Sequence, residues 1–273
     1  FMMAELTGIP YLTIAIAAII PAFFYYFSLF LSVVIEAKKS GIEVDKTTKY
    51  KITIQTLIDA MMFIAPIAVI IYVLADGRSP ANAGFYGILT AFIFGFINPE
   101  LRKNPKKILI SLQNAGKASG KLLIAIGVIG IIIGVMNMTG VGLRFANLIL
   151  SVSEHSLFLA LFFSMLGALI LGMGMPTLPA YLIIILIMGP AIENFNIPIL
   201  LAHLFVFYYG VASSLTPPVA LAAYAAAPIA NSKPLGTAVM AMRLGFAKFL
   251  IPFIFVYYPG IILSEYFDLT ESL

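Results

Sequence analysis

The sequence has no cysteine, only two histidines and few charged residues. Without cysteine the chain has no disulfide, no thiolate metal site and no cysteine nucleophile. Asp, Glu, Lys and Arg make up 10% of the residues, against about 25% in soluble domains. The net charge of +4 does not indicate nucleic-acid binding, because the Lys and Arg residues are concentrated in two loops rather than along one face.

Apolar residues dominate what is present. They make up 62% of the chain, and the mean hydropathy is +1.06. A transmembrane helix needs ~20 mostly apolar residues, so the chain is best divided into spans. Full spans are expected at residues 10–35, 56–75, 83–97, from residue 122 onward and at 237–263. The composition therefore predicts an all-α polytopic membrane protein.

The two basic loops, residues 36–55 and 98–121, predict the orientation. Lys and Arg mark cytoplasmic loops, so both loops are expected inside and the turn at Asp76 outside. Residues 108–118 are amphipathic enough to lie on the membrane surface. Pro21 is expected to kink the first span. The chain starts at Phe1 with no basic n-region or cleavage site, so we expect no signal peptide and a C-terminal part of a longer protein.

Two short segments interrupt the apolar pattern at depths where a span should be continuous. They are GMGMPT, residues 172–177, within the long segment 156–193, and SSLTPP, residues 213–218, within 199–230. In lipid, non-helical backbone survives only where protein or a water-filled cavity surrounds it. We therefore predict a re-entrant hairpin with its tip at the first segment and a discontinuous helix at the second. Two such breaks point to a transporter binding site.

The residues at the breaks offer oxygen atoms for a cation. The tip has backbone carbonyls around Gly172 and Gly174 and the Thr177 hydroxyl. The second break has carbonyls from Gly210 onward, which lose amide partners because prolines follow. Oxygen ligands without a carboxylate suit Na⁺ rather than a tight divalent site. The alternatives are an ordinary Gly-Pro turn at the tip and a simple proline kink at the second break.

These arguments give two residue sets. The predicted Na⁺ ligands, through backbone or side-chain oxygens, are Gly172, Gly174, Thr177, Gly210, Ser213, Ser214 and Thr216. The predicted substrate-binding residues are Thr177, Ser214, Asn137 and Thr139. Asn137 and Thr139 lie at an interruption of the fourth span, where contacts between packed helices are an equally good explanation.

Two other function classes remain open. An intramembrane serine hydrolase would pair Ser213 or Ser214 with His203, but ten helical residues separate His203 from Ser213 by roughly 15 Å, and no GxSxG sequence is present. A non-transporting membrane scaffold would leave both breaks without a purpose. We expect His155 and His203 at the outer interface, and Arg243 and Lys248 to extend their charges to the membrane surface.

The stretches GMGMPTLPAY (residues 172–181) and FVFYYGVASSLTPPVALAAYAAAPIA (residues 205–230) resemble the large membrane subunit of TRAP transporters. Residues 1–30 and 243–257 look like the fused-permease subgroup. The resemblance implies a Na⁺-coupled secondary importer of an organic acid in the inner membrane, working by an elevator movement. It implies a periplasmic substrate-binding protein and a small membrane subunit as partners.

The same resemblance implies two inverted repeats, each with a re-entrant hairpin and a broken helix. This chain holds the second hairpin and the second broken helix, and the first hairpin and most of the first broken helix are expected upstream. A weak internal similarity agrees: residues 1–10 and 224–234 both place a small-residue helix end and a Pro-containing turn before a long aromatic-rich span.

Overall fold

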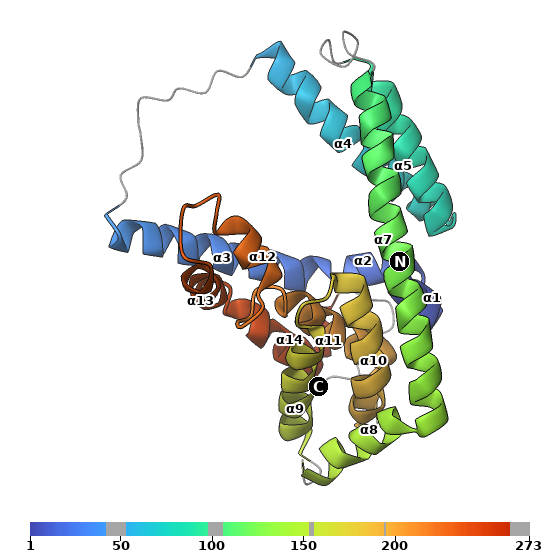
Figure 1. Ribbon diagram of the computed structural model, residues 1–273, viewed down its shortest axis with the longest axis vertical. Coiled ribbons are helices and arrows are strands. Elements are labelled where there is room, and N and C mark those ends of the chain that lie inside the picture. The colour runs from blue at the N-terminus through green and yellow to red at the C-terminus, as the bar shows by residue number, and fades with distance from the viewer. Residues whose placement is uncertain (42–52, 98–105, 153–155, 194, 263–273) are drawn as a thin grey trace. The chain divides into compact units, whose positions relative to one another are not determined.

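The computed structural model describes residues 1–41, 53–97, 106–152, 156–193 and 195–262. Every regular element in these residues is a helix, which confirms the all-α prediction (Figure 1). The chain divides into two compact units. Unit 1 contains Phe1, Pro10–Leu12 and Glu43–Ile124, and unit 2 contains Met2–Ile9, Thr13–Ile42 and Ala125–Leu273. Each unit is described by itself.

Unit 1 is built around a helical hairpin of α4 (Ile54–Ala75) and α5 (Pro80–Gly95). Ser79 caps α5 by accepting a hydrogen bond from the Asn82 amide, and Pro80 occupies the first helical position, where its missing N–H costs nothing. Gly87 lets the two helices approach closely, because a Cβ there would lie 2.7 Å from Ile70 Cδ1. The expected spans 56–75 and 83–97 therefore correspond to α4 and α5.

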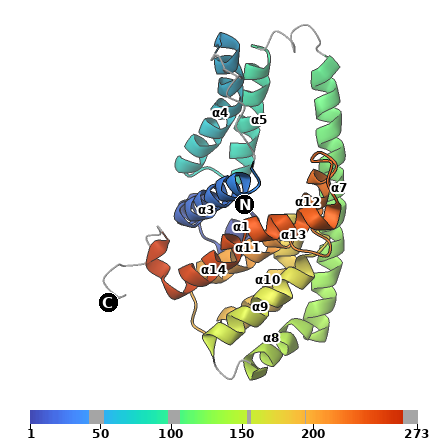
Figure 2. The ribbon, with the colours of Figure 1, turned by 90° about the vertical axis from the view of Figure 1, so that its left-hand side faces the viewer.

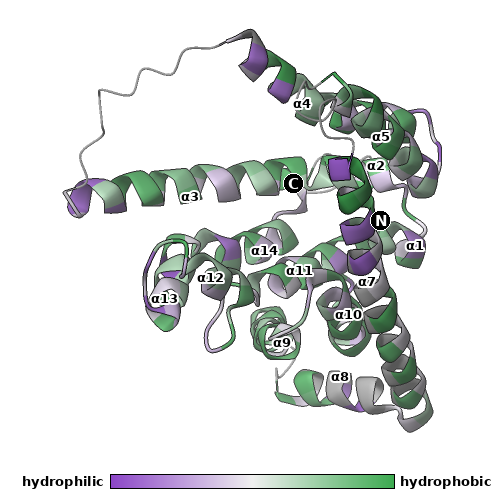
Figure 3. Cartoon of the chain, turned by 45° about the horizontal axis from the view of Figure 1, so that its top comes forward, coloured by the Kyte–Doolittle hydropathy of each residue, from purple (hydrophilic) through white to green (hydrophobic). Residues whose placement is uncertain are grey.

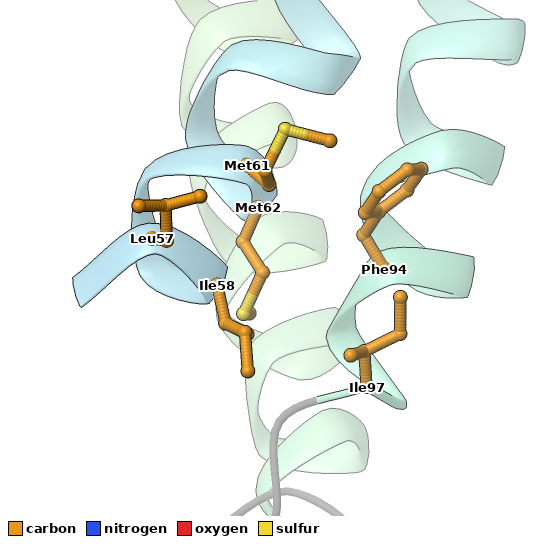
Figure 4. A pocket seen from close by; sticks show the side chains of 6 residues that line it. All are labelled: Leu57, Ile58, Met61, Met62, Phe94 and Ile97. Atoms are coloured by element: carbon orange, nitrogen blue, oxygen red, sulfur yellow. The ribbon is translucent and has the colours of Figure 1, made fainter. Parts of the chain in front are cut away.

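The open end of this hairpin holds an apolar cavity of about 240 Å³ (Figure 4). Its lining consists of Leu57, Ile58, Met61, Met62, Phe94 and Ile97. None of these side chains carries a hydrogen-bonding group other than methionine sulfur. The cavity therefore has the chemistry of a hydrocarbon-facing surface rather than of a site for a polar substrate.

The helix α7 (Lys106–Thr139) is continuous over 34 residues. The basic loop expected at 98–121 is therefore shorter than predicted, since residues 106–121 belong to the same helix as the fourth span. The placement of 108–118 on the membrane surface stays a prediction. Gly116 and Gly120 weaken a helix without breaking it, and no proline lies within α7. The expected interruption at its end is confirmed: Gly140 has φ +65° and separates α7 from α8 (Val141–Val152).

Unit 2 is centred on two apolar helices, α10 (Thr177–Glu193) and α11 (Ile199–Ala212), which hold most of the fully buried side chains. The helices α8, α9 (Leu157–Gly172) and α14 (Ala247–Tyr257) pack against this pair (Figure 2). At 16, 17 and 14 residues, α9, α10 and α11 are each shorter than the ~20 residues of a span. Such lengths agree with the prediction that the segments 156–193 and 199–230 are broken in the middle.

The first and last long spans are each divided into two helices. The first has a turn at Ala18 between α2 (Tyr11–Ala17) and α3 (Ile19–Lys39). Pro21 explains it, because a proline has no N–H to donate to the carbonyl four residues earlier. The last span is divided at Gly245 into α13 (Pro234–Leu244) and α14. A short helix precedes each of these two spans: α1 (Met2–Thr7) before the first and α12 (Leu221–Ala226) before the last. The similarity between residues 1–10 and 224–234 is therefore also seen in the order of the helices.

The outer surface of unit 2 has the composition expected in lipid. The helix α3 is apolar along most of its length (Figure 3). Its exposed aromatic side chains are Phe23, Phe24, Tyr26, Phe27 and Phe30. Across both units, three of the described segments are long and apolar enough to cross a membrane: Tyr11–Lys39, Gln55–Ala75 and Pro234–Tyr257. Together with the shorter apolar helices, they make the chain an all-α polytopic membrane protein.

Candidate functional site

The first predicted break is a tight turn between α9 and α10. The helix α9 ends at Gly172, and α10 begins at Thr177 directly after Pro176. Gly174 has φ +77°, a left-handed conformation that only glycine adopts without strain. The Met173 amide donates to the Ile170 carbonyl at 3.3 Å, and the Met175 amide donates to Gly172 at 3.4 Å. The sequence GMGMPT thus forms the tip of a helical hairpin.

The second predicted break begins where α11 ends at Ala212. The next regular helix, α12, starts only at Leu221. Pro217 and Pro218 have no amide proton, so the helix cannot continue its hydrogen bonds through them. Ala220 then adopts a left-handed conformation with φ +33° before α12 begins. The discontinuity expected at residues 213–218 is therefore present.

Three hydroxyls complete the end of α11. Each donates a hydrogen bond to one of the last three carbonyl oxygens of the helix. The bonds run from Ser213 to Gly210 at 2.7 Å, from Ser214 to Val211 at 2.7 Å and from Thr216 to Ala212 at 2.9 Å. The prediction that these carbonyls lose their amide partners is wrong for two of them, because the Val211 and Ala212 carbonyls also accept from the Ser214 and Leu215 amides at 3.3 Å and 2.9 Å. For the Gly210 carbonyl, the described donor is the Ser213 hydroxyl. The hydroxyls of the Ser-Ser-Leu-Thr sequence therefore cap the C-terminal end of α11.

The tip and the break are in direct contact through Ser213. This side chain is 1% exposed, and its Oγ lies 3.0 Å from the Gly172 carbonyl oxygen as well as 2.7 Å from that of Gly210. A hydroxyl has one proton, so these two carbonyls share it. The approach is close, because a Cβ on Gly172 would lie 2.6 Å from Ser213 Oγ. Three neutral oxygen atoms from two distant segments therefore meet at one buried point.

The other predicted ligands belong to the same two segments as Gly172 and Ser213, and they differ in how exposed they are. Thr216 is buried and Ser214 is half-buried. Thr177 and Gly174 are exposed at the tip, and a Cβ on Gly174 would lie 3.6 Å from Val219 Cγ1, on the far side of the break. The contacts of the tip with the break thus extend beyond Ser213.

The two predicted residues from the fourth span are not brought to this point by any described contact. Thr139 is exposed and donates a hydrogen bond to the Val135 carbonyl at 2.8 Å, within its own helix α7. Asn137 lies on α7 as well, but its side chain is outside the described part of the structure. Their role in substrate binding stays a prediction.

Sequence reasoning missed a buried polar pair between α10 and α11. The Tyr181 hydroxyl lies 2.6 Å from His203 Nδ1, and the two residues are 2% and 6% exposed. His203 is thus buried between helices, while its expected depth near the outer interface stays a prediction; His155 lies outside the described residues. The pair could not be recognised from the sequence, because the two residues are far apart along the chain. Only the antiparallel packing of α10 on α11 brings their side chains together.

The same bond argues against a serine hydrolase. His203 Nδ1 is engaged by Tyr181, and Ser213 donates to backbone carbonyls. A serine nucleophile needs a base within hydrogen-bond reach, and the described contacts of Ser213 and Ser214 provide none. In the part of the chain that the structure describes, no group of three His, Asp or Glu residues is placed to hold a metal ion.

The position of the Lys248 ammonium also differs from the prediction. It is 7% exposed, and its ammonium lies 5.3 Å from the centre of the Tyr25 ring, so it does not extend to a polar surface. Arg243 is exposed, and its guanidinium lies 3.7 Å from Glu36. The buried lysine is held by a cation–π contact between α14 and α3.

Apolar half-helices that meet at two breaks define a membrane protein of the transporter class. A comparison with protein-family models supports this and is more specific. Residues 1–269 match the family described as "Tripartite ATP-independent periplasmic transporter, DctM component". The chain belongs to this family, the large permease subunits of TRAP transporters. A comparison with curated proteins finds no match.

Proposed function

We propose that this chain contributes one Na⁺ site and part of the substrate cavity to a secondary transporter that imports an organic acid. The membership in the TRAP permease family supports the reaction class. The observation that carries the Na⁺ site is the meeting of Gly172 O, Gly210 O and Ser213 Oγ at one buried point. A neutral set of carbonyl and hydroxyl oxygens suits a monovalent hard cation better than a divalent one.

Na⁺ binding requires one rearrangement that the geometry allows. The Ser213 proton turns away from the carbonyls, and the three oxygen atoms then present lone pairs to the ion. Ser214 and Thr216 are the nearest further hydroxyls, since both donate to the neighbouring carbonyls of α11. Gly174 and Thr177 would complete the site from the tip. The ion thus replaces hydrogen bonds that already connect the tip to the break.

The substrate carboxylate is expected beside the tip. The helix α10 points its N-terminal end at this region, and Thr177, its first residue, is exposed. The positive end of a helix dipole favours an anionic group, and a hydroxyl at that end can donate to it. We assign Thr177 and Ser214 to substrate contact on this ground. Na⁺ bound at Ser213 would add a positive charge nearby and so couple the two ligands.

The remaining features of the proposal follow from the family. We propose that the permease lies in the cytoplasmic membrane of a bacterium or archaeon. A periplasmic binding protein delivers the acid, and a small membrane subunit, fused or separate, accompanies this chain. An elevator movement of the bundle formed by α9, α10 and α11 would carry the site across the membrane. The continuous packing of these three helices supports movement as one body.

The test uses the complete permease with its binding protein in liposomes. Ser213→Ala should raise the Na⁺ concentration for half-maximal uptake of the organic acid by roughly tenfold or more, because a ligand is lost. Ser28→Ala is the matched control. Ser28 in α3 donates to the Tyr25 carbonyl at 2.8 Å, the same kind of bond outside the proposed site. Uptake that ignores the Na⁺ gradient in the unmodified protein would refute Na⁺ coupling.

A further inference from the structure

The pair formed by Tyr181 and His203 is the strongest polar contact in the described core that the proposed site does not use. Its 2.6 Å bond connects two helices at residues 22 positions apart, and both side chains are buried. The surroundings are apolar and aromatic; the Phe207 ring packs edge-on against Tyr181 with centroids 6.0 Å apart. A buried polar group without a partner is costly, so the hydroxyl and the imidazole depend on each other.

The pair holds together the two elements that would supply the Na⁺ ligands. Tyr181 lies one helical turn after Thr177, so it belongs to the part of α10 next to the tip. His203 lies on α11, about two turns before Gly210. The Tyr181 backbone packs directly on Gly210: a Cβ at Gly210 would lie 3.6 Å from the Tyr181 amide nitrogen, an ordinary contact distance.

The Tyr181–His203 bond would matter most when Na⁺ is bound. Without the ion, the Ser213 hydroxyl connects the tip to the break by donating to Gly172. When Ser213 Oγ accepts the ion instead, its proton turns away and that hydrogen bond is lost. The ion would then bridge the Gly172 and Gly210 carbonyls, and the packing of α10 on α11 would set the separation at which it does so. The Tyr181–His203 bond is unaffected by the rotation of Ser213, and it fixes α10 on α11.

We propose that Tyr181 and His203 are positioning residues for the Na⁺ site. Their hydrogen bond holds α10 in register on α11, so that the carbonyls of Gly172 and Gly210 stay at the separation that one ion can bridge. The inference rests on the proposed Na⁺ site. It predicts that loss of the bond weakens Na⁺ binding although neither side chain touches the ion.

Tyr181→Phe removes only the hydroxyl and tests this directly. In the complete permease it should raise the half-saturating Na⁺ concentration by roughly threefold to tenfold, with the maximal rate at saturating Na⁺ largely kept. Tyr209→Phe is the matched control. Tyr209 is on α11 and fully buried, but its hydroxyl donates to the Phe249 carbonyl at 2.7 Å and so connects α11 to α14. Its loss should lower stability without moving the Na⁺ midpoint.

The partner is tested with two substitutions at His203. Asn can place either its amide oxygen or its amide NH₂ near the position of Nδ1, so it can pair with the Tyr181 hydroxyl in either direction. His203→Asn should therefore keep the Na⁺ midpoint within about twofold of the unmodified value. His203→Leu has no hydrogen-bonding group and should match Tyr181→Phe. The double variant Tyr181→Phe/His203→Leu should shift the midpoint no further than either single change, because both remove the same bond.

The outcomes separate the two proposals. A Na⁺-independent unmodified permease refutes the Na⁺ site and the positioning role with it. A Na⁺-dependent permease in which Tyr181→Phe and Tyr209→Phe have the same Na⁺ midpoint refutes the positioning role alone. If Tyr181→Phe does not fold, the two His203 variants decide the matter: equal midpoints for Asn and Leu overturn the inference, and a shift confined to Leu supports it.

Discussion

Adding one methyl group at Gly172 should separate the hairpin tip from the broken helix. A Cβ built on Gly172 lies 2.6 Å from Ser213 Oγ and 2.9 Å from Ser213 Cβ. Real Cβ atoms do not approach other atoms so closely, so the serine or the tip must move. Ser213 has little freedom to move, because its hydroxyl is held by Gly210 on its own helix. Gly172→Ala is therefore expected to push the tip away and break the Ser213–Gly172 hydrogen bond.

The cost can be estimated from two terms. Overpacking a filled core by one methyl group costs about 1–3 kcal/mol, and a lost hydrogen bond contributes about 1 kcal/mol. Gly210→Ala is the matched control on the other side of the same contact. There the new Cβ meets Ile184 and Tyr181 atoms at 3.6 Å or more, an ordinary distance. Because Ala favours helix over Gly by up to about 1 kcal/mol, this variant should be as stable as the original protein or more stable.

The assay compares both variants in the complete permease. Thermal unfolding in detergent should place Gly172→Ala below the unmodified protein by a clear margin, and Gly210→Ala at or above it. The Na⁺ midpoint of uptake should rise for Gly172→Ala, because one proposed ligand carbonyl is displaced. Equal melting temperatures for the two variants would show that the tip does not press on Ser213, and the site geometry argued from this contact would fail.

Three further predictions concern other parts of the chain. Thr216→Val should raise the Na⁺ midpoint more than it lowers stability, which falls by about 1 kcal/mol for the lost bond to the Ala212 carbonyl; a normal midpoint with a lowered melting temperature would remove Thr216 from the site. Gly174→Ala should destabilise the tip by roughly 1–2 kcal/mol, since φ is +77°, and thermal unfolding measures it. In this cysteine-free chain, a single cysteine at Ser79 should react with impermeant reagents only from outside, and one at Lys106 only from the cytoplasm; the reverse pattern would overturn the orientation.

The two breaks were predictable because their causes are local. Proline removes a donor wherever it stands, and glycine permits turns that other residues do not. The sequence therefore indicates the ends of α9 and α11 within a residue or two. The turn at Ala18 follows from Pro21 for the same reason. Hydroxyl residues beside a proline break also predict oxygen ligands, and that role of Ser213 stays a prediction; the structure shows its hydroxyl between the Gly172 and Gly210 carbonyls.

The features that sequence reasoning missed depend on packing between distant segments. The Tyr181–His203 bond needs the register of α10 on α11, which no local pattern encodes. The bend at Gly245 was not predicted, because a glycine inside a helical pattern breaks some helices and not others. At α7 the error was different: residues 106–121 were assigned to a loop because of their lysines, but they form the first part of a continuous helix.

The break at residues 213–218 contains hydroxyl side chains and no carboxylate, and this matters for the proposed mechanism. The hydroxyls of Ser213, Ser214 and Thr216 donate to the last carbonyls of α11, so the groups of the proposed site are neutral and paired with one another. A carboxylate in the same place would leave a bare negative charge whenever the ion was absent, at a cost of several kcal/mol in an apolar environment. If the proposed elevator returns without Na⁺, ligands that pair with one another would lower the cost of that step. The hydroxyl protons that Na⁺ would displace are the same ones that donate to the end of α11, which connects the fold of the break to its proposed function.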